Sequence, residues 1–453
     1  MLRLNVIFLY IFALFCAAPA FAKDKLLDIR EVTSAGGITA WLVEDHTLPI
    51  ITMQFSFKGA GSALDPAEKQ GLALMASNTM DEGAGEYDSA AFQKLLTDNN
   101  IVLSFGAGRD HFGGNLKTLT KHKDLAFKLL RLALNEPRFD ADPVERMRAA
   151  NLARIRSSLS DPEWKSARLM NDVAFAGHPY ALNSGGTLST LQAITPADLQ
   201  NFAKTRLGRN NLRIGIVGDI SPEELKTVMD AVFGELPESV TLPAVADLKV
   251  QNGGATILYE EYIPQTIIDI TQPGIDRKHP DYYTAMLMNF ILGGSGFGSR
   301  LTEEIREKRG LTYGIGTYFN DLEHAETFVA STSTKNESVA EVLGLIGVEW
   351  KKMQNEPVTD TELAEIKSYV IGSFPLSIAS TDNIASIILS LQLDDLPIDY
   401  LDKRKERISA VSKEDIQNLA KWLLTPGKLT TVLVGKPQGV TPTKTVDKLP
   451  NVD

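Results

Sequence analysis

The chain has 453 residues, of which 43% are hydrophobic and 23% charged, and its formal net charge is −11 at pH 7. This length exceeds what one ordinary core buries, so we expect at least two domains. The composition is that of a soluble globular protein and excludes a fibrous or disordered chain. An acidic chain without a long run of Lys or Arg binds nucleic acid poorly, so no nucleic-acid partner is expected.

The first 22 residues have the pattern of a secretory signal peptide. Arg3 supplies a short positive segment, the apolar run 6–18 follows, and Ala20-Phe21-Ala22 is a small-x-small cleavage site. The run is short for a bilayer span, and an uncleaved membrane anchor is the alternative. The only cysteine, Cys16, lies in this segment, so the mature chain is expected to have neither disulfides nor thiolate ligands. We expect a secreted, periplasmic protein without membrane contact after cleavage.

Short apolar runs and longer periodic stretches alternate along the rest of the chain. The short runs predict strands, and they lie at 50–57, 212–217, 266–271 and 429–434. The longest periodic stretches predict helices at 142–159 and 360–371. Strands with helices between them are typical of a layered α+β domain.

The mature sequence repeats itself. Segments 194–204 and 411–421 share Asp, Gln, Asn, Ala and Lys at an offset of 217 (411 − 194), and Leu48-Pro49 matches Ile263-Pro264 at an offset of 215 (263 − 48). Thr195 and Ser412, the second residues of these segments, are predicted helix N-caps, and Asp198 and Asp415 follow three residues later, as in a capping box. A period this long indicates two duplicated domains rather than a solenoid.

Proline, glycine and the loss of apolar periodicity suggest where the domains begin and end. Each domain is predicted to be a mainly antiparallel sheet packed against helices. The predicted divisions are a signal peptide at 1–22, a first domain at 23–235, a linker at 236–254, a second domain at 255–440 and a loose tail at 441–453.

Two segments carry a family resemblance. The first is 57–83, and the second, which is more specific, is 289–313 and contains the run Gly-Gly-Ser-Gly-Phe-Gly-Ser-Arg at 293–300. Both resemble the pitrilysin/insulinase family of zinc peptidases, which includes the mitochondrial processing peptidase subunits. The resemblance covers essentially the whole mature chain. It implies two homologous layered α/β domains that form half of a clamshell.

The same resemblance implies that the zinc site is degenerate. Active members carry His-x-x-Glu-His on one helix, where the two His bind zinc and the Glu activates water, and a later Glu completes the site. Aligned on Gly71, these positions hold Leu74, Ser77 and Asn78, and the later position aligns with Arg154. No two of the six histidines are four residues apart. We expect no cofactor on this chain; the alternative is a zinc site built from scattered His, Asp and Glu.

The resemblance also implies a substrate-binding pair, Arg306 and Tyr313, which in relatives faces a zinc ion across a closed cavity. Arg donates hydrogen bonds to substrate carbonyls, and the Tyr hydroxyl supports a developing oxyanion. The Gly-rich loop with Gly293, Gly294 and Gly296 would lie near the bound peptide. The alternative is that Arg306 is a solvated charge, Tyr313 a core aromatic and the glycines a turn before a helix.

In the bacterial branch of this family, two chains of this size form a clamshell, and one of them can lack the zinc motif. This chain therefore resembles the non-catalytic, substrate-positioning subunit of a secreted heterodimeric zinc endopeptidase that acts on peptides or unfolded polypeptides. Its partner would be a homologous catalytic subunit with an intact His-x-x-Glu-His motif, which would hold the zinc. The alternatives are a catalytically retired scaffold or peptide-binding protein of the same fold and, less favoured, a self-sufficient metallopeptidase.

Overall fold

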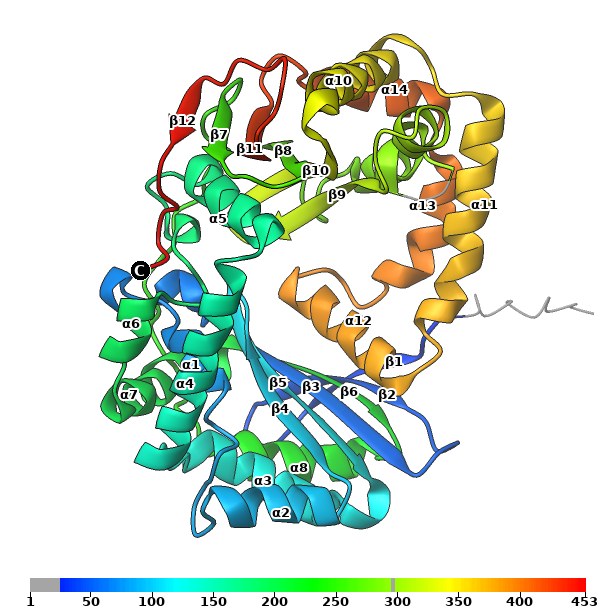
Figure 1. Cartoon of the computed structure of the whole chain (residues 1–453). Coiled ribbons are helices and arrows are strands. Elements are labelled where there is room, and N and C mark those ends of the chain that lie inside the picture. The colour runs from blue at the N-terminus through cyan, green and yellow to red at the C-terminus, as the bar shows by residue number, and fades with distance from the viewer. Residues whose placement is uncertain (1–24, 295–297) are drawn as a thin grey trace, which may run out of the picture.

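The structure is a computed structural model that describes residues 25–294 and 298–453 (Figure 1). The expected signal peptide at 1–22 and Gly296 lie outside the described residues. Each half of the described chain contributes one six-stranded sheet, and helices cover both sheets.

The first half has six strands and eight α-helices among its described residues. Its strands are β1 Ile29–Thr33, β2 Thr39–Glu44, β3 Ile50–Lys58, β4 Val102–Ala107, β5 His111–Leu119 and β6 Leu212–Gly218. Its helices are α1 Leu72–Ser77, α2 Ser89–Asp98, α3 Lys123–Asn135, α4 Ala141–Ser158, α5 Pro162–Ala174, α6 Leu188–Ala193, α7 Pro196–Arg206 and α8 Pro222–Phe233.

The second half has six strands and six α-helices among its described residues. Its strands are β7 Thr256–Glu260, β8 Gln265–Pro273, β9 Ile315–Leu322, β10 Ala325–Lys335, β11 Thr430–Gly435 and β12 Lys444–Val446. Its helices are α9 Tyr282–Asn289, α10 Val339–Asn355, α11 Asp360–Ser377, α12 Thr381–Leu393, α13 Arg404–Ala410 and α14 Lys413–Leu423.

The two sheets have the same topology. The first has the order β1-β2-β6-β3-β5-β4, and the second has the order β12-β7-β11-β8-β10-β9. The register agrees as well, because Gln54 pairs with Gly215 in the first sheet and Asp269 pairs with Val432 in the second. These pairs are related by the offsets of 215 and 217 found in the sequence. The predicted α+β fold with two homologous layered units and mainly antiparallel sheets is confirmed.

The ends of each repeat fold as their caps predict. Thr195 begins α7 and Ser412 begins α14, each with a reciprocal capping box to the Asp three residues later. The outer face of the first sheet is covered by α2, α3 and α8, and α10 and α14 lie over the second sheet (Figure 1). The amphipathic helices thus bury one face of each sheet in its own half.

The inner face of each sheet is covered by a helix from the other half. Helix α5 packs on β8 and β11, and α12 packs on β3 and β6 (Figure 1). Hydrogen bonds connect each of these helices to the sheet of the other half. Ser166 on α5 donates to Asp269 on β8 at 2.5 Å, and the Gln392 amide on α12 donates to the Ile214 carbonyl on β6 at 2.8 Å. The linker at 236–254 contains neither helix nor strand. It divides the chain in sequence, whereas the two halves interlock in space.

The C-terminal tail differs from the loose segment that its prolines predict. Strand β12 pairs with β7 in parallel, and the chain then descends to the first half (Figure 1). There Asn183 donates to the Asn451 carbonyl at 3.1 Å and Ser189 to the Asp453 carbonyl at 2.7 Å. The tail satisfies backbone groups along the edge of β7, which requires no apolar period in its own side chains.

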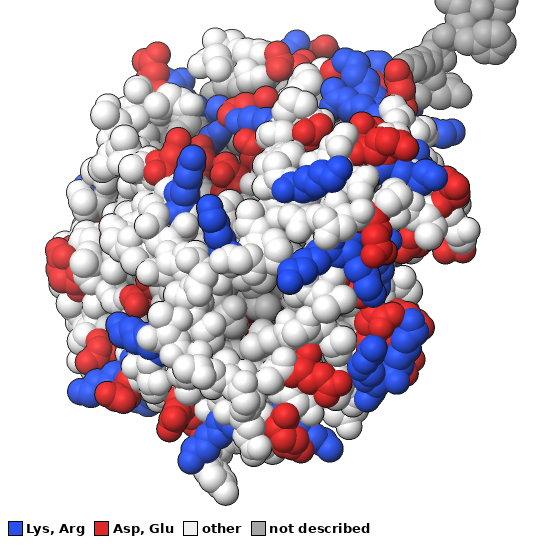
Figure 2. Space-filling view, turned by 90° about the horizontal axis from the view of Figure 1, so that it is seen from above, with Lys and Arg blue, Asp and Glu red and all other residues white. Residues whose placement is uncertain are grey.

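The charged residues are dispersed on the face seen from above (Figure 2). Acidic and basic side chains are interspersed on this face, and between them lies a broad area of uncharged residues. Among residues 25–294 and 298–453, no single helix has the length and hydropathy of a membrane span; α11 and α12 meet these criteria only together, as a pair bent by 114°.

Candidate functional site

The first half of the expected site is helix α1, at the position of the family's zinc motif. Gly71 begins this helix with a φ of +87°, and a Cβ there would lie 2.9 Å from the Cα of Gly186. Glycine is required here because the backbone is left-handed and another backbone segment approaches it closely. The fold therefore keeps the turn that presents the helix.

The polar side chains at the end of α1 form hydrogen bonds with the helix itself and with α4. The Ser77 hydroxyl donates to the Leu74 carbonyl at 2.8 Å, and the Asn78 amide donates to Asn151 at 3.2 Å. Asn151 was missed by the sequence reasoning, which aligned Arg154 with this place. Arg154 is exposed and forms no side-chain hydrogen bond or ion pair with the described residues. Asn151 rather than Arg154 is thus the α4 residue that faces Asn78.

The periodicity of α4 explains why Arg154 does not face α1. The apolar residues on which the alignment rests, Leu152 and Ile155, are both buried, and Arg154 between them is turned to solvent. These residues do not fit a zinc ion, because Leu74 has no ligand atom and the polar groups of Ser77 and Asn78 already have partners. Within the described chain there is also no group of three or more His, Cys, Asp or Glu that could hold a metal.

The second half of the expected site is the loop 310–314 before β9. The buried Thr312 hydroxyl lies 2.8 Å from both the Ser333 carbonyl and the Thr332 hydroxyl, and Thr334 donates to the Leu311 carbonyl at 2.5 Å. The Thr332 hydroxyl also donates to the Gly314 carbonyl at 2.8 Å, so the residues on both sides of Tyr313 are fixed. Tyr313 itself is 85% exposed, which excludes its being a core aromatic.

Arg306 lies in the helical segment Thr302–Glu307. Its guanidinium is paired with Glu307 at 3.5 Å, and its carbonyl accepts a hydrogen bond from Gly310 at 2.8 Å. The cavity that Tyr313 lines does not have Arg306 in its wall. The predicted convergence of Arg306 and Tyr313 on a substrate therefore stays a prediction.

The glycines of the expected loop have different surroundings. Gly293 is buried in the helical segment Phe290–Gly294, and a Cβ there would lie 2.6 Å from the Thr317 hydroxyl. The absence of a side chain lets this segment pack against β9. Gly294 ends the segment, and Gly296 lies outside the described residues. A role of these glycines beside a peptide stays a prediction.

Two equivalent cavities lie on the inner faces of the sheets, each next to the exchanged helix. The first has a volume of about 550 Å³ and is lined by β3, β4, β5 and α12, with residues from the second half at its end. The second has a volume of about 620 Å³ and is lined by β8, β9, β10 and α5. Their walls correspond strand by strand, as the duplication requires. Both are within the size range of small-molecule and side-chain sites.

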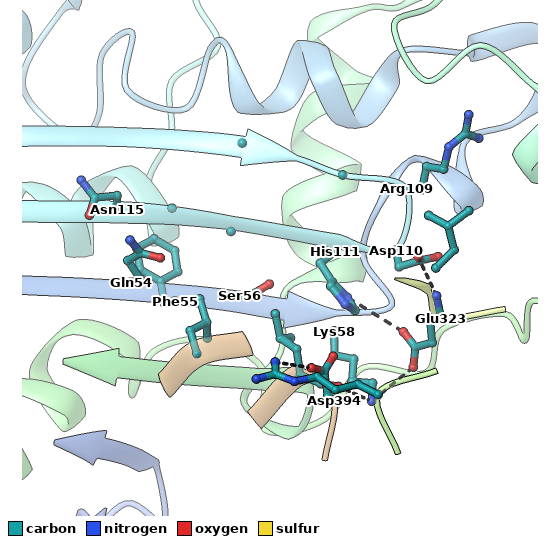
Figure 3. Close-up of a pocket in the computed structure, with 18 of the residues that line it drawn as sticks. Gln54, Phe55, Ser56, Lys58, Arg109, Asp110, His111, Asn115, Glu323 and Asp394 are labelled. Atoms are coloured by element: carbon teal, nitrogen blue, oxygen red, sulfur yellow. Dashed lines mark hydrogen bonds and ion pairs between the residues drawn. The ribbon is translucent and has the colours of Figure 1, made fainter. Parts of the chain in front are cut away.

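Several charges of the first cavity are paired within the chain (Figure 3). The Lys58 ammonium lies 2.8 Å from Asp395 and 3.3 Å from Glu323, and Arg277 lies 3.0 Å from Asp394. Lys58 comes from the first half and both its partners come from the second. The network thus ties the halves together and leaves these charges compensated.

His111 points into the same cavity towards Glu323, at 3.9 Å (Figure 3). Burial lowers the pKa of His111, and the nearby Glu323 carboxylate only partly offsets this effect. The imidazole is therefore neutral at neutral pH.

The second cavity has a different chemistry. Tyr313 and Tyr318 line it together with Asp269, whose carboxylate accepts a hydrogen bond from Ser166 on α5. Burial raises the pKa of Asp269. Among the described residues that line this cavity, none is Lys, Arg or His. Asp269 and Tyr318 were missed by the sequence reasoning; the signal was a lone acid within the apolar run 266–271.

Known proteins with a similar sequence or fold include inactive members of a peptidase family. Residues 193–370 match the family model of the peptidase M16 inactive domain. A crystal structure of a peptidase M16 inactive domain from Pseudomonas fluorescens is 28% identical, with a TM-score of 0.85, and covers 92% of this chain and 100% of its own. A protease structure from Helicobacter pylori is 17% identical, has a TM-score of 0.80, and covers 90% of this chain and 100% of its own.

Curated relatives extend the similarity over most of the chain. A non-peptidase homologue, YmxG, from Helicobacter pylori is 26% identical over 397 residues, which are 86% of this chain and 90% of that protein. A probable mitochondrial-processing peptidase subunit beta from Schizosaccharomyces pombe is 21% identical over 444 residues, or 93% of this chain and 94% of that protein. Together with the fold and the altered α1 positions, these matches support the interpretation of the chain as an inactive homologue of the pitrilysin (M16) peptidase family.

Proposed function

We propose that this chain is the non-catalytic, substrate-positioning subunit of a secreted, periplasmic heterodimeric zinc endopeptidase. Its partner would be a homologous subunit with an intact His-x-x-Glu-His motif, which holds the zinc and performs the hydrolysis. The substrates would be peptides or unfolded polypeptides. This chain would help to enclose them and would supply Arg306 and Tyr313 to the reaction.

The state of Tyr313 is the observation that most supports this proposal. A large aromatic side chain that is 85% exposed contributes little to the core, yet the loop that carries it is fixed by the buried Thr312 and by Thr334. An exposed side chain on a fixed backbone is suited to contacts with another molecule. Tyr313 also lines a cavity on the inner face of its sheet, and the fold is otherwise complete although the zinc position is lost.

Reconstitution with the motif-bearing homologue from the same source tests the proposal. The two chains are mixed, and cleavage of an unfolded polypeptide is compared with that by each chain alone. Activity that requires both chains supports the proposal. The same activity with and without this chain refutes it and favours the alternative, a retired scaffold of the same fold.

A substitution in the reconstituted complex tests the role of the hydroxyl. Tyr313→Phe should lower turnover by about a hundredfold while the two chains still associate, because a donor to a developing oxyanion acts mainly in the transition state. The matched control is Tyr262→Phe, because Tyr262 is 90% exposed and does not line the cavity. Normal turnover in the Tyr313→Phe complex would reduce this chain to a passive wall.

A further inference from the structure

The second cavity holds a carboxylate that the described chain does not neutralise. Asp269 lies in the middle of β8, flanked on both sides by buried isoleucines, and its hydrogen-bond partners are the hydroxyls of the fully buried Ser166 and of Ser331. No ion pair of the described residues includes Asp269. Burying a carboxylate without a cation costs free energy, because two hydroxyl donors replace only part of its hydration.

The fold itself does not require an acid at this position. Gln54 occupies the equivalent place in the first sheet, and its amide donates to the Asp382 carbonyl on α12 at 3.3 Å. A neutral amide therefore satisfies the same contact between a central strand and an exchanged helix. The charged residues beside Gln54, such as Lys58, have their counter-ions within the chain. Asp269 is thus an acid at a strand position where the equivalent cavity has a neutral amide.

The remaining wall of the second cavity suits a cation. Tyr313 and Tyr318 present aromatic rings, and both are at least half exposed. Burial and the nearby Asp269 carboxylate raise the pKa of Tyr318, so its phenol stays neutral and can share hydrogen bonds. Asn320 adds a polar oxygen atom to the wall and Glu163 adds a second carboxylate, whereas the Ser331 hydroxyl is bonded to Asp269. A carboxylate with two aromatic rings and uncharged acceptors is a recurrent way to hold an organic cation.

We propose that this cavity binds a cationic group of a polypeptide, with Asp269 as its counter-ion and Tyr313 and Tyr318 beside it. The group is a Lys or Arg side chain or a free amino terminus. Each of these carries a positively charged nitrogen, and none of the described residues that line the cavity does. This inference rests on the proposed function only in taking the ligand to be a polypeptide. The substrates would then be polypeptides with a cationic group at the position that enters the second cavity.

Peptide binding to the isolated full chain tests this inference without the partner. The probes are short, C-terminally labelled peptides of Ala, Leu and Ser with one central Lys, Arg or Met, each with a free or an acetylated amino terminus. Fluorescence anisotropy gives the dissociation constants. The cationic peptides should bind on the order of tenfold more tightly than the acetylated Met peptide, and added salt should reduce the difference. The acetylated and free series separate the side chain from the amino terminus as its source.

Two variants assign the preference to the cavity. Asp269→Asn should abolish it, and Asp98→Asn, which removes an exposed acid of α2, should leave it intact. Because burial opposes ionisation of Asp269, Asp269→Asn should also have a higher thermal midpoint than the wild type at neutral pH, so loss of binding cannot be attributed to unfolding. Equal binding of cationic and neutral peptides, binding of none of them, or a preference that survives Asp269→Asn each overturns the inference.

These outcomes are distinct from those of the proposed function. A reconstituted complex that is active without any charge preference refutes the inference and leaves the proposed function standing. A chain that binds cationic peptides through Asp269 and yet never alters the activity of a partner supports the inference and refutes the subunit role.

Discussion

Gly215 should tolerate a side chain poorly, because α12 lies directly on this part of β6. A Cβ at this position would lie 2.8 Å from the Ala385 carbonyl oxygen and 2.8 Å from Cγ1 of Ile388, whereas ordinary contact begins at 3.4 Å. Since one of these atoms is backbone, α12 would have to retreat by about 0.6 Å (3.4 − 2.8). Overpacking of this kind costs about 1–3 kcal/mol. Replacing Gly by Ala in a strand returns about 0.5–1 kcal/mol. The net loss for Gly215→Ala should therefore be about 1 kcal/mol, within a range of about 0–2.5 kcal/mol.

Equilibrium unfolding in urea measures this loss as a lower midpoint with an unchanged slope. Gly344→Ala is the matched control, because Gly344 lies within α10 and a Cβ there would meet nothing within 4 Å. It should stabilise the protein by about 0.5–1 kcal/mol through helix propensity. If Gly215→Ala proved as stable as Gly344→Ala, α12 would not lie on the first sheet as described.

Three further predictions concern charge, metal and connectivity. Glu362→Gln breaks the two-pronged pair with Arg300 (2.7 and 3.0 Å). Burial opposes ionisation of Glu362, but this pair and the Thr359 cap outweigh it and lower the pKa to about 2. After allowance for solvent screening, the loss of unfolding free energy in urea should be about 1–2 kcal/mol. Because the pKa is depressed in the folded state, the full loss should appear above pH 4.5 and should vanish as the pH falls towards 2. A loss that is independent of pH would contradict this prediction. The isolated, dialysed chain should contain no stoichiometric zinc by elemental analysis, since Leu74, Ser77 and Asn78 provide no site, and one retained zinc per chain would contradict this. A single proteolytic cut within 241–247 should leave the two fragments together on size exclusion, because α5 and α12 are exchanged; fragments that separate without denaturant would count against the interlocked packing.

The duplication and most elements of the fold could be predicted from the sequence, because they depend on local patterns. The strand predicted at 50–57 is β3, the one at 266–271 lies within β8, and the helix predicted at 142–159 is α4 within one residue at each end. Alternation, periodicity and caps determine such elements within a few residues. The helix predicted at 360–371 is longer, since α11 continues through Pro375 to Ser377.

The exchange of helices could not be predicted in this way. An apolar helix face is suited to either inner sheet face, so the sequence of α5 does not say which sheet it covers. The cavities share this limit, because their walls combine strands of one half with a helix of the other. The resemblance identified the α1 positions and Tyr313. Asp269 and Asn151 became visible only when their neighbours in space were known.

The exchanged helices also bear on how a chain of this kind could arise. A single copy of the repeat would leave the inner face of its own sheet bare, because the helix that covers this face comes from the other copy. Two identical copies could cover both faces only as a symmetric pair that traded helices, so the ancestor of this architecture is best understood as a domain-swapped homodimer. Fusion of the two copies then freed the equivalent inner positions to evolve separately, and Gln54 and Asp269 record that divergence.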